Sequence, residues 1–220
     1  MNRRTLFVSG AATLSTAVFA GGTYYVVNQR SATVPAVQTV EGADKLVRPH
    51  SPVIGPLNAP VTIVEFFDPA CEACRAFHPI VKQIMDAYPG KIRLVIRYAA
   101  FHPGSAEAVR IVEAARLQDR FVPVLEALLD GQSSWASHRA GNSPDLAWNF
   151  AAVAGLDVER ARRERLMPHI TATLNFDAED VRTFKVRGTP TFFVNGRPLI
   201  EFGSEQLRAL VRDEVARTTK

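Results

Sequence analysis

The stretch Phe66–Cys74, with the sequence FFDPACEAC, decides how the rest of the chain is interpreted. The apolar run Pro60–Phe67 ahead of it has the composition of a buried strand. Apolar residues at helical spacing follow the two cysteines, namely Phe77, Ile80, Val81, Ile84, Met85 and Tyr88. The pattern predicts a strand joined directly to a helix, with Cys71 exposed near the helix start and Cys74 one turn further in.

A helix N-terminus favours negative charge and therefore lowers the pKa of a thiol placed there. We expect Cys71 to be the nucleophile and Cys74 to be the thiol that resolves a mixed disulfide. These are the only two cysteines in the 220 residues, so they react with each other or with a substrate.

A cysteine pair can also bind zinc or form a structural disulfide. Structural zinc sites usually have four ligands, and the sequence has no second cysteine pair, although His78 and His102 leave a mixed cysteine and histidine site open. A structural disulfide across so short a loop would constrain the unfolded chain little. The spacing favours redox chemistry at Cys71 and Cys74 over both alternatives.

The first 29 residues differ from the rest in composition. Arg3 and Arg4 precede a stretch from Thr5 to Val27 without a charged residue. About 20 uncharged residues can cross a bilayer, so residues 1–29 are predicted to be a signal peptide or an N-terminal membrane anchor. The positive-inside rule then places the rest of the chain outside the cytoplasm. We expect a periplasmic protein whose N-terminal segment contacts or crosses the inner membrane.

Residues 30–57 contain several prolines without a clear period, and we expect a linker there and one domain over residues 58–220. A hydrophobic content of 47% is enough for a sizeable core. The formal net charge is +4, and basic residues alternate with acids, as in Glu159–Arg165. That mixture is typical of a solvated helix face, and it argues against a nucleic-acid partner.

The segment Lys91–Tyr98 alternates charged and apolar residues and predicts a second strand. With the first strand and helix it forms a right-handed βαβ unit with parallel strands. A helical insert at about residues 103–168 is predicted from four segments with helical patterns, Gly104–Gln118, Phe121–Leu129, Leu146–Ala154 and Val158–Leu166.

The end of the chain predicts the other half of a sheet. A helix over residues 170–184 leads to a strand at Thr191–Val194. Asn195-Gly196 is a strong hairpin signal, and Pro198–Phe202 is expected to return as a strand. A last helix is expected over residues 204–216. The fold class is α/β, with a mixed central sheet flanked by helices.

In this order the elements resemble the thioredoxin superfamily, and in particular its DsbA-like branch of extracytoplasmic thiol-disulfide oxidoreductases, over roughly residues 58–217. The Cys71–Cys74 pair after an aromatic strand carries this resemblance first. Pro79 lies five positions after Cys74, where the active-site helix of the family has its kinking proline. Thr189-Pro190 matches the cis-proline of the family, and the helical insert separates the DsbA-like branch from thioredoxin itself.

The resemblance implies roles for three further residues. The peptide bond before Pro190 would be cis and would leave the backbone of Thr189 available to a substrate peptide next to Cys71. Glu65, six positions before Cys71, matches the buried acid beneath the pair and would accept the proton of Cys74. The resemblance implies no organic cofactor and no metal.

The sequence also departs from the DsbA-like pattern. That branch commonly has a proline and a histidine between its cysteines, whereas this chain has Glu72 and Ala73. Alanine cannot stabilise a thiolate and a nearby carboxylate opposes it, so we expect Cys71 to be less acidic, and the protein a weaker oxidant, than DsbA proper. His78 is expected to be a surface or packing residue, and His102 part of a turn.

The sequence thus predicts an extracytoplasmic oxidoreductase that acts on exported proteins by dithiol-disulfide exchange, with disulfide formation favoured and a membrane redox partner. Two alternatives remain open. The first is a reductase or isomerase with specific client proteins. The second is a copper-binding chaperone that uses Cys71, Cys74 and a histidine.

Overall fold

The structure, a computed structural model, describes residues 38–137 and 141–218, and the chain from Thr39 onward forms one compact unit. The predicted signal peptide or anchor of residues 1–29 lies outside the described residues. In the part of the chain that is described, no helix is long and apolar enough to span a bilayer.

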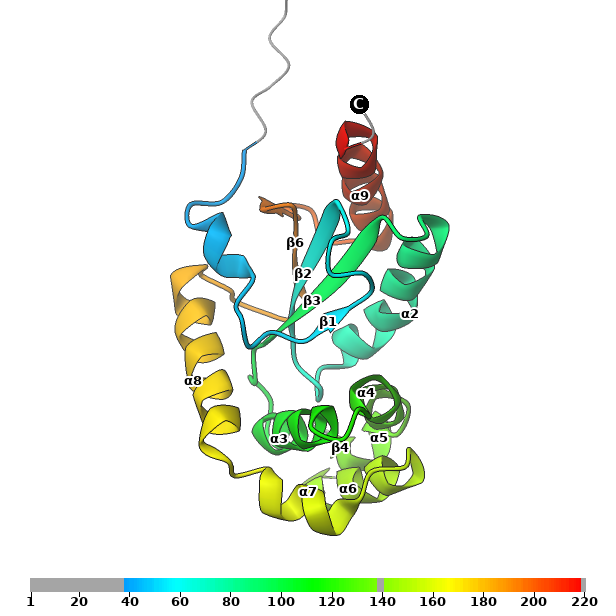
Figure 1. Cartoon of the computed structure of the whole chain (residues 1–220), viewed down its shortest axis with the longest axis vertical. Helices are drawn as coiled ribbons and strands as arrows, with labels where there is room; N and C mark the ends of the chain where they lie inside the picture. The colour runs from blue at the N-terminus through cyan, green and yellow to red at the C-terminus, as the bar shows by residue number, and fades with distance from the viewer. Residues whose placement is uncertain (1–37, 138–140, 219–220) are drawn as a thin grey trace, which may run out of the picture. The chain divides into compact units, whose positions relative to one another are not determined.

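A five-stranded mixed sheet forms the centre of this unit, in the order β1-β3-β2-β6-β7 (Figure 1). Its strands are β1 Val53–Ile54, β2 Val61–Phe67, β3 Ile92–Tyr98, β6 Thr191–Val194 and β7 Arg197–Pro198. The predicted parallel pairing of β2 with β3 is confirmed, and the other three pairs are antiparallel. β2 and β3 are rich in apolar and β-branched residues because both of their faces are covered.

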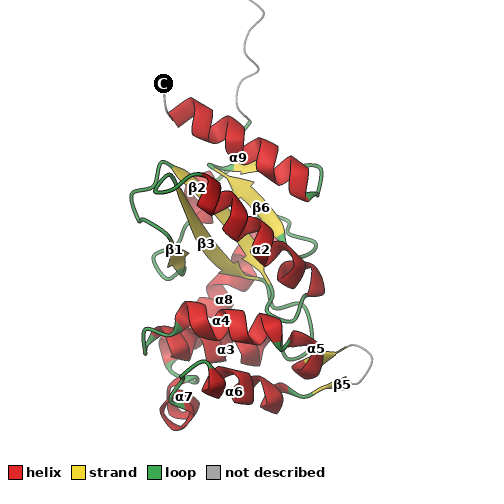
Figure 2. Cartoon of the chain, turned by 90° about the vertical axis from the view of Figure 1, so that its right-hand side faces the viewer, coloured by secondary structure: helices red, strands yellow, loops and turns green. Residues whose placement is uncertain are grey.

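Helices cover both faces of the sheet. Figure 2 looks onto α2 (Glu72–Ala87) and α9 (Ser204–Thr218), which pack on one face, while α8 (Pro168–Thr183) and the short 3₁₀ helix η1 (Ala43–Leu46) cover the other. Successive residues of a strand point to opposite faces. Ile63 therefore belongs to the core under α2 and α9, and Val64 to the core under α8.

The expected helical insert is present and lies beyond one end of the sheet (Figures 1 and 2). It consists of α3 Ser105–Arg116, α4 Phe121–Asp130, α5 Gln132–Trp135, α6 Pro144–Val153 and α7 Val158–Glu164, with a small hairpin of β4 Ala136–Ser137 and β5 Gly141–Asn142. Trp135 is fully buried in it and donates a hydrogen bond to the carbonyl oxygen of Leu128 (2.7 Å). The insert contacts the start of α2, where the cysteines lie.

Two expectations differ from the structure. The second half of the predicted linker belongs to the compact unit: Leu46 is 1% exposed, and Val53 pairs with Val95 of β3. The elements in this segment, η1 with four residues and β1 with two, are too short to show a hydrophobic period in the sequence. The predicted strand Pro198–Phe202 is also shorter than expected and covers only Arg197–Pro198. The chain leaves the sheet after Leu199 to reach α9, on the face that α2 also covers.

Candidate active site

The two cysteines lie where β2 is joined to α2. Cys71 is the N-cap residue of α2 and Cys74 lies in its first turn, and both are free thiols in this structure. The Cys71 thiol donates a hydrogen bond to the carbonyl oxygen of Thr189 (3.2 Å). The expectation that Cys71 is exposed is wrong, because the chain at Thr189 lies against the sulfur and leaves the residue 6% exposed. Cys74 is completely buried, as its helical position predicts.

The surroundings make the two thiols unequal. A hydrogen bond from the Cys74 thiol is the main cause that lowers the pKa of Cys71 to about 5. Burial opposes the shift, and the side chain of Thr189 and the backbone N–H groups of Ala73 and Cys74 support it. Burial raises the pKa of Cys74 well above its usual range, and its hydrogen bond to Cys71 adds to the shift. At neutral pH this geometry holds Cys71 as a thiolate and Cys74 as a thiol, which is the asymmetry that a nucleophile and a resolving thiol need.

Glu65 lies on β2, on the face covered by α2, and is 2% exposed. Burial, with the charge of Cys71 as a second cause, raises the pKa of Glu65 to about 8. Its Oε1 atom has no hydrogen-bond partner among the described residues. A carboxyl group in this position is protonated at neutral pH and can exchange that proton with a neighbouring group.

The peptide bond between Thr189 and Pro190 is cis, as expected from the sequence. The loop that contains it separates two surface pockets. One has a volume of about 480 Å³ and is lined by Cys71, Phe101, His102 and residues 186–189. The other has a volume of about 290 Å³ and is lined by residues 188–192, Leu199 and Phe202. Cys71 lines the first of these pockets, so a substrate sulfur can reach the cysteine from there.

Sequence analysis overlooked Asp68, a completely buried acid directly after β2. Its carboxylate accepts hydrogen bonds from the backbone N–H groups of Ala70 (2.8 Å), Phe101 (2.8 Å) and His102 (3.0 Å), from the His102 ring (2.7 Å) and from the Ser105 hydroxyl. The Asp68 N–H also donates to the sulfur of Cys74 (3.5 Å). Asp68 therefore fixes the active-site loop to the start of the helical insert. An acid directly after a buried strand was the available signal.

Gln132 was also overlooked. It lies on α5 in the insert and is 1% exposed, and its Nε2 atom donates to the carbonyl oxygens of Pro69 (2.8 Å) and Cys71 (3.0 Å). Its Oε1 atom has no hydrogen-bond partner in the described part of the chain. The insert thus holds the backbone on both sides of the loop that leads into Cys71, and no sequence motif marks this residue.

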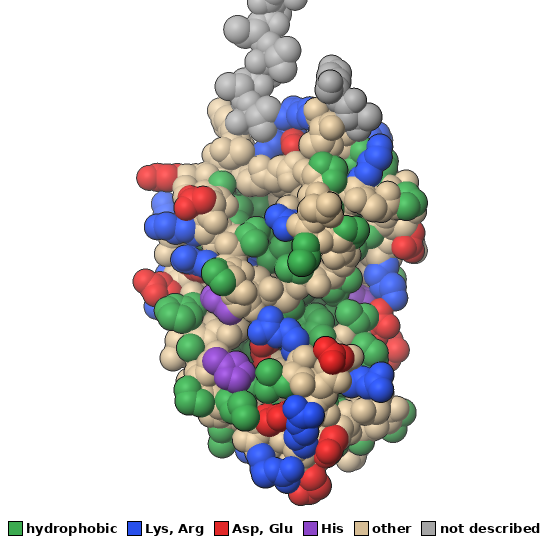
Figure 3. Space-filling view, viewed as in Figure 1, with side chains coloured by type: hydrophobic (Ala, Val, Ile, Leu, Met, Phe, Trp, Pro, Cys, Tyr) green, Lys and Arg blue, Asp and Glu red, His purple; other side chains and the backbone are tan. Residues whose placement is uncertain are grey.

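His78 on α2 lies 3.5 Å from Glu126 of α4, and only 14% of its side chain is exposed, which agrees with the expected packing role. Within residues 38–137 and 141–218, no three histidine, cysteine or acidic side chains are arranged to hold a metal ion. The copper-binding alternative therefore lacks an assembled set of ligands there. Figure 3 shows basic and acidic side chains interspersed on one face of the molecule, without a continuous basic surface.

Comparison with known proteins agrees with this fold. Residues 48–213 match the family model described as Thioredoxin. A thioredoxin-like oxidoreductase from Silicibacter pomeroyi DSS-3 is similar in structure, with 27% identity, a TM-score of 0.68 and coverage of 82% of this chain and 98% of that one. Wolbachia pipientis alpha-DsbA1 has the same fold at 17% identity and a TM-score of 0.68, with 80% and 97% coverage.

One group of sequence relatives is much longer. The chain is 32% identical over 177 residues to the Na(+)/H(+) antiporter NhaA 1 of Salinispora arenicola (strain CNS-205), which covers 77% of this chain and 26% of the antiporter. The chain spans about a quarter of the length of these curated relatives. Antiport is named for the whole proteins and is not carried over to this chain.

Proposed function

The chain belongs to the thioredoxin family, and we propose that it is a DsbA-like oxidoreductase that exchanges disulfides with exported proteins outside the cytoplasm through Cys71 and Cys74. One observation carries the proposal above the others. The pKa of Cys71 is lowered to about 5 at the start of α2, while its neighbour Cys74 stays protonated and buried. Cys71 is thus prepared to form a mixed disulfide with a partner protein, and Cys74 is prepared to resolve that mixed disulfide.

The reaction proceeds in two exchanges. A substrate thiolate attacks Cys71 of the oxidised protein, the bond between Cys71 and Cys74 breaks, and a mixed disulfide forms. Cys74 leaves as a thiolate and takes the proton of Glu65, whose raised pKa of about 8 keeps it protonated until then. A second substrate thiolate attacks the substrate sulfur of the mixed disulfide, and Cys71 leaves as a stable thiolate. Two electrons pass from the substrate dithiol to the protein.

The surface next to Pro190 suits an extended segment of a substrate protein. Leu199 and Phe202 line the pocket on this side. Phe202 is 56% exposed, and its ring packs at a tilt against Phe77 of α2, with 4.6 Å between the ring centroids. Ile200, between them in sequence, is 84% exposed. Apolar substrate side chains next to the reacting cysteine would bury this surface. The Thr189 carbonyl, which Cys71 no longer uses once it is a thiolate, could pair with the substrate backbone.

Disulfide formation is the proposed direction. A thiolate that is stabilised in the reduced protein makes the disulfide form more oxidising. The Cys71 pKa of about 5 lies between the values of about 7 for thioredoxin and about 3.5 for DsbA, so an oxidant weaker than DsbA remains the prediction. Reoxidation after each turnover then requires a redox partner, for which a membrane protein is proposed because residues 1–29 have the pattern of an export signal or an anchor.

The equilibrium reduction potential of the pair against glutathione tests the direction. The superfamily spans about −270 to −120 mV, and we expect a value in the oxidising half of that span. A value near −270 mV would contradict disulfide formation and support the reductase alternative. A Cys71→Ser variant should lose all exchange, whereas the Cys71 thiolate of Cys74→Ser should attack a substrate disulfide, release one substrate thiolate and accumulate the mixed disulfide. Exchange by the Cys71→Ser variant would contradict the proposed function itself.

A further inference from the structure

Two neighbouring pockets extend the surface around Cys71 toward α8. The pocket of about 480 Å³ is lined by Cys71, Phe101, His102 and residues 186–189. A smaller pocket of about 290 Å³ is lined by residues 98–101 and by Leu174, Ala178, Val181 and Arg182 of α8. Phe101 borders both pockets, so they form one surface that begins at the reactive sulfur. We call it the α8-side surface.

Phe101 is held on this surface and remains partly open to solvent. Its backbone N–H donates to Oδ2 of the buried Asp68 (2.8 Å), while 46% of the residue is exposed. The smaller pocket beside it is apolar apart from Tyr98 and Arg182, and the Tyr98 hydroxyl already donates to Glu113 (2.6 Å). An aromatic residue beside an apolar pocket is surface that a partner side chain can bury favourably.

The arginines on this surface lack acidic partners. Arg187 lines the pocket beside Cys71, Arg182 lines the smaller pocket, and both are exposed. Within residues 38–137 and 141–218, no acid lines either pocket and no salt bridge joins either arginine to a carboxylate. Arg182 lies in the last turn of α8, where a cation stabilises the helix end. Arg187 lies beyond the helix, so it is available to a carboxylate of a bound protein.

The chain that contains Arg187 is anchored on both sides. The backbone N–H of Val186 donates to the carbonyl oxygen of Val181 (2.9 Å) and closes the end of α8, and Val186 is 8% exposed. After Arg187, the carbonyl oxygen of Gly188 accepts a hydrogen bond from the hydroxyl of Thr191 (2.7 Å). A cation on an anchored segment loses less conformational entropy when a partner binds.

Building on the proposed function, we propose that the α8-side surface binds the segment of a substrate protein next to its reacting cysteine, and that it selects segments with a carboxylate and an apolar side chain. The carboxylate pairs with Arg187, and the apolar side chain enters the pocket between Phe101 and α8. The pocket that Leu199 and Phe202 line has no charged residue among its described lining, so selection by charge belongs to the α8 side. The surface adds no chemical step, because the substrate thiolate still attacks Cys71 and Cys74 still leaves.

The selection by charge is tested with three cysteine peptides that attack the oxidised full chain. They differ only in the residues beside the cysteine, which are aspartate, asparagine or lysine. With rates corrected for the thiolate fraction of each peptide, the aspartate peptide should react about fivefold faster than the lysine peptide. The preference should weaken between about 0.01 M and 1 M salt, because exposed charges are screened.

Two arginine variants locate the origin of this preference. Arg187→Glu should reverse the order of the aspartate and lysine peptides. Arg163→Glu makes the same change of charge at an exposed arginine of α7 that lines neither pocket, and it should keep the order of the unsubstituted protein. Arg187→Gln provides a second substitution if Arg187→Glu unfolds, and it should abolish the preference without reversing it.

The apolar pocket is tested with peptides that carry leucine or alanine at one of the positions near the cysteine. At the best position leucine should raise the rate about fivefold over alanine. Ala178→Phe, at an exposed position of α8 in the lining of this pocket, fills the space and should remove the preference for leucine. Ala152→Phe, at an exposed position of α6, should leave the preference unchanged.

Three results would overturn the proposal. The first is an unsubstituted protein that prefers neither aspartate over lysine nor leucine over alanine, which would point to the redox partner as the occupant of this surface. The second is an equal change of rate for all three charge peptides in Arg187→Glu, which would mean that the arginine acts on Cys71 alone. The third is a preference for leucine that survives in Ala178→Phe. If the unsubstituted protein reacts with no peptide, the proposed function itself fails, and that result is distinct from all three.

Discussion

Glu65 and Arg97 are neighbours at the centre of the sheet and are treated in opposite ways. Glu65 of β2 is in register with Ile96 of β3, and Phe66 is in register with Arg97. Because successive residues alternate, Glu65 faces α2 and Arg97 faces α8. Both are buried, at 2% and 0% exposed. Glu65 leaves one carboxyl oxygen without a hydrogen bond in the described structure, whereas all three nitrogens of the Arg97 guanidinium donate.

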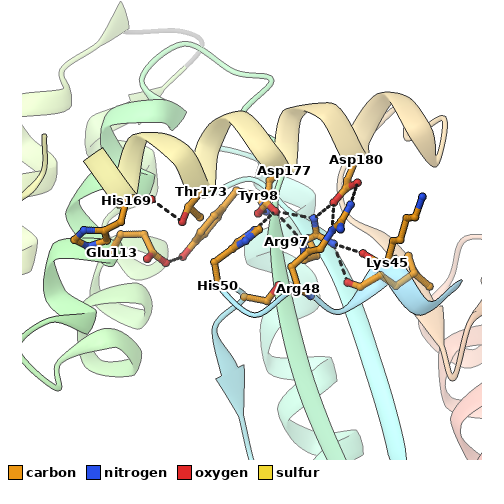
Figure 4. Close-up of polar contacts among 12 residues, drawn as sticks. Lys45, Arg48, His50, Arg97, Tyr98, Glu113, His169, Thr173, Asp177 and Asp180 are labelled. Carbon is orange, nitrogen blue, oxygen red and sulfur yellow. Dashed lines mark hydrogen bonds and ion pairs between the residues drawn. The ribbon is translucent and has the colours of Figure 1, made fainter. Parts of the chain in front are cut away.

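Figure 4 shows the hydrogen bonds and ion pairs around Arg97. Arg97 donates to Asp177 (2.9 Å) and Asp180 of α8 and to two backbone carbonyls of η1. Arg48 and His50 reach the same two acids from the chain between η1 and β1. Burial opposes the ionisation of Asp180, but the hydrogen bonds from Arg48 and Arg97 outweigh it and lower its pKa.

The buried charges on the two faces of the sheet therefore have different roles, structural under α8 and chemical under α2. On the α8 face Asp177, Asp180 and Arg97 each have an opposite charge beside them, the pKa of Asp180 is lowered, and the cluster joins α8, β3 and the N-terminal part of the unit. On the α2 face no described cation lies beside Glu65, and burial raises its pKa to about 8, into the range where a proton can be transferred. The ion pairs of Arg97 hold the elements under α8 together, whereas Glu65, which lacks such a pair, can take part in proton transfer.

Breaking the paired side should have the largest effect on stability. Arg97→Met leaves Asp177 and Asp180 buried without their shared cation, which should lower the free energy of unfolding by about 3–5 kcal/mol. Urea unfolding measures this change. The pKa of Cys71, followed by thiolate absorbance, should not change, because Arg97 acts on the other face of the sheet.

The exposed ion pair of Arg160 with Glu164 (2.7 Å) provides a control for this substitution. Arg160→Met should lower the free energy of unfolding by less than about 0.5 kcal/mol, since exposed pairs contribute little. If both arginine variants lost the same free energy of unfolding, the burial of the Arg97 cluster would not be what determines its contribution to stability.

Removing the unpaired acid should stabilise the protein. Between pH values of about 4.5 and 8 unfolded Glu65 has lost its proton while folded Glu65 keeps it, so stability falls as the pH rises through this window. Glutamine does not titrate and avoids the loss. In the reduced protein Glu65→Gln should raise the free energy of unfolding by about 2–4 kcal/mol at pH 8 and by less than about 1 kcal/mol at pH 5. Urea unfolding at both pH values measures this.

Glu126 provides the matched control, because a hydrogen bond from Lys82 lowers its pKa. Glu126→Gln should therefore change stability slightly and in the opposite direction. A Glu65→Gln variant that is no more stable at pH 8 than the unsubstituted protein would show that Glu65 is ionised in the fold, and the contrast with Arg97 would disappear.

The elements around the site could be predicted because their signals are local. The apolar run of β2, the helical spacing of α2 and the Thr189-Pro190 step are each contained in a few consecutive residues. The network of Arg97 could not be predicted in this way. Arg48 and Asp180 are 132 residues apart, and Arg48 lies in a proline-containing segment without a period.

The same limit applies to the supports of Cys71. Gln132 is an ordinary polar residue in the sequence, and Asp68 is marked only by its place directly after a buried strand. What distinguishes both is burial together with hydrogen bonds to the active-site loop. Burial depends on how the insert packs against the sheet, which no local pattern gives. The prediction that Cys71 is exposed was wrong for the same reason, because the residue that covers its sulfur, Thr189, is 118 residues away in the sequence.

Of the three stability changes, at Arg97, Glu65 and Gln132, the smallest is expected at Gln132. This substitution tests whether the α2 side of the sheet, where the cysteines lie, also depends on paired polar groups. Gln132→Met keeps the length of the side chain but removes the donor of the carbonyl oxygens of Pro69 and Cys71 (2.8 and 3.0 Å). The free energy of unfolding should fall by about 1–2 kcal/mol, because two buried acceptors lose a partner. Urea unfolding of the reduced protein measures this change.

Gln118 allows the effect of burial to be isolated. It also makes two hydrogen bonds, with the backbone N–H and carbonyl of Asp157 (3.0 and 3.2 Å), but at the exposed surface. Gln118→Met should cost less than about 0.5 kcal/mol, because water can replace both bonds. Similar losses for the two glutamine variants would mean that the loop before Cys71 is held by its own backbone. A larger loss at Gln132 would mean that the helical insert holds the cysteine in place, so that the unpaired acid and the thiolate sit in a rigid frame.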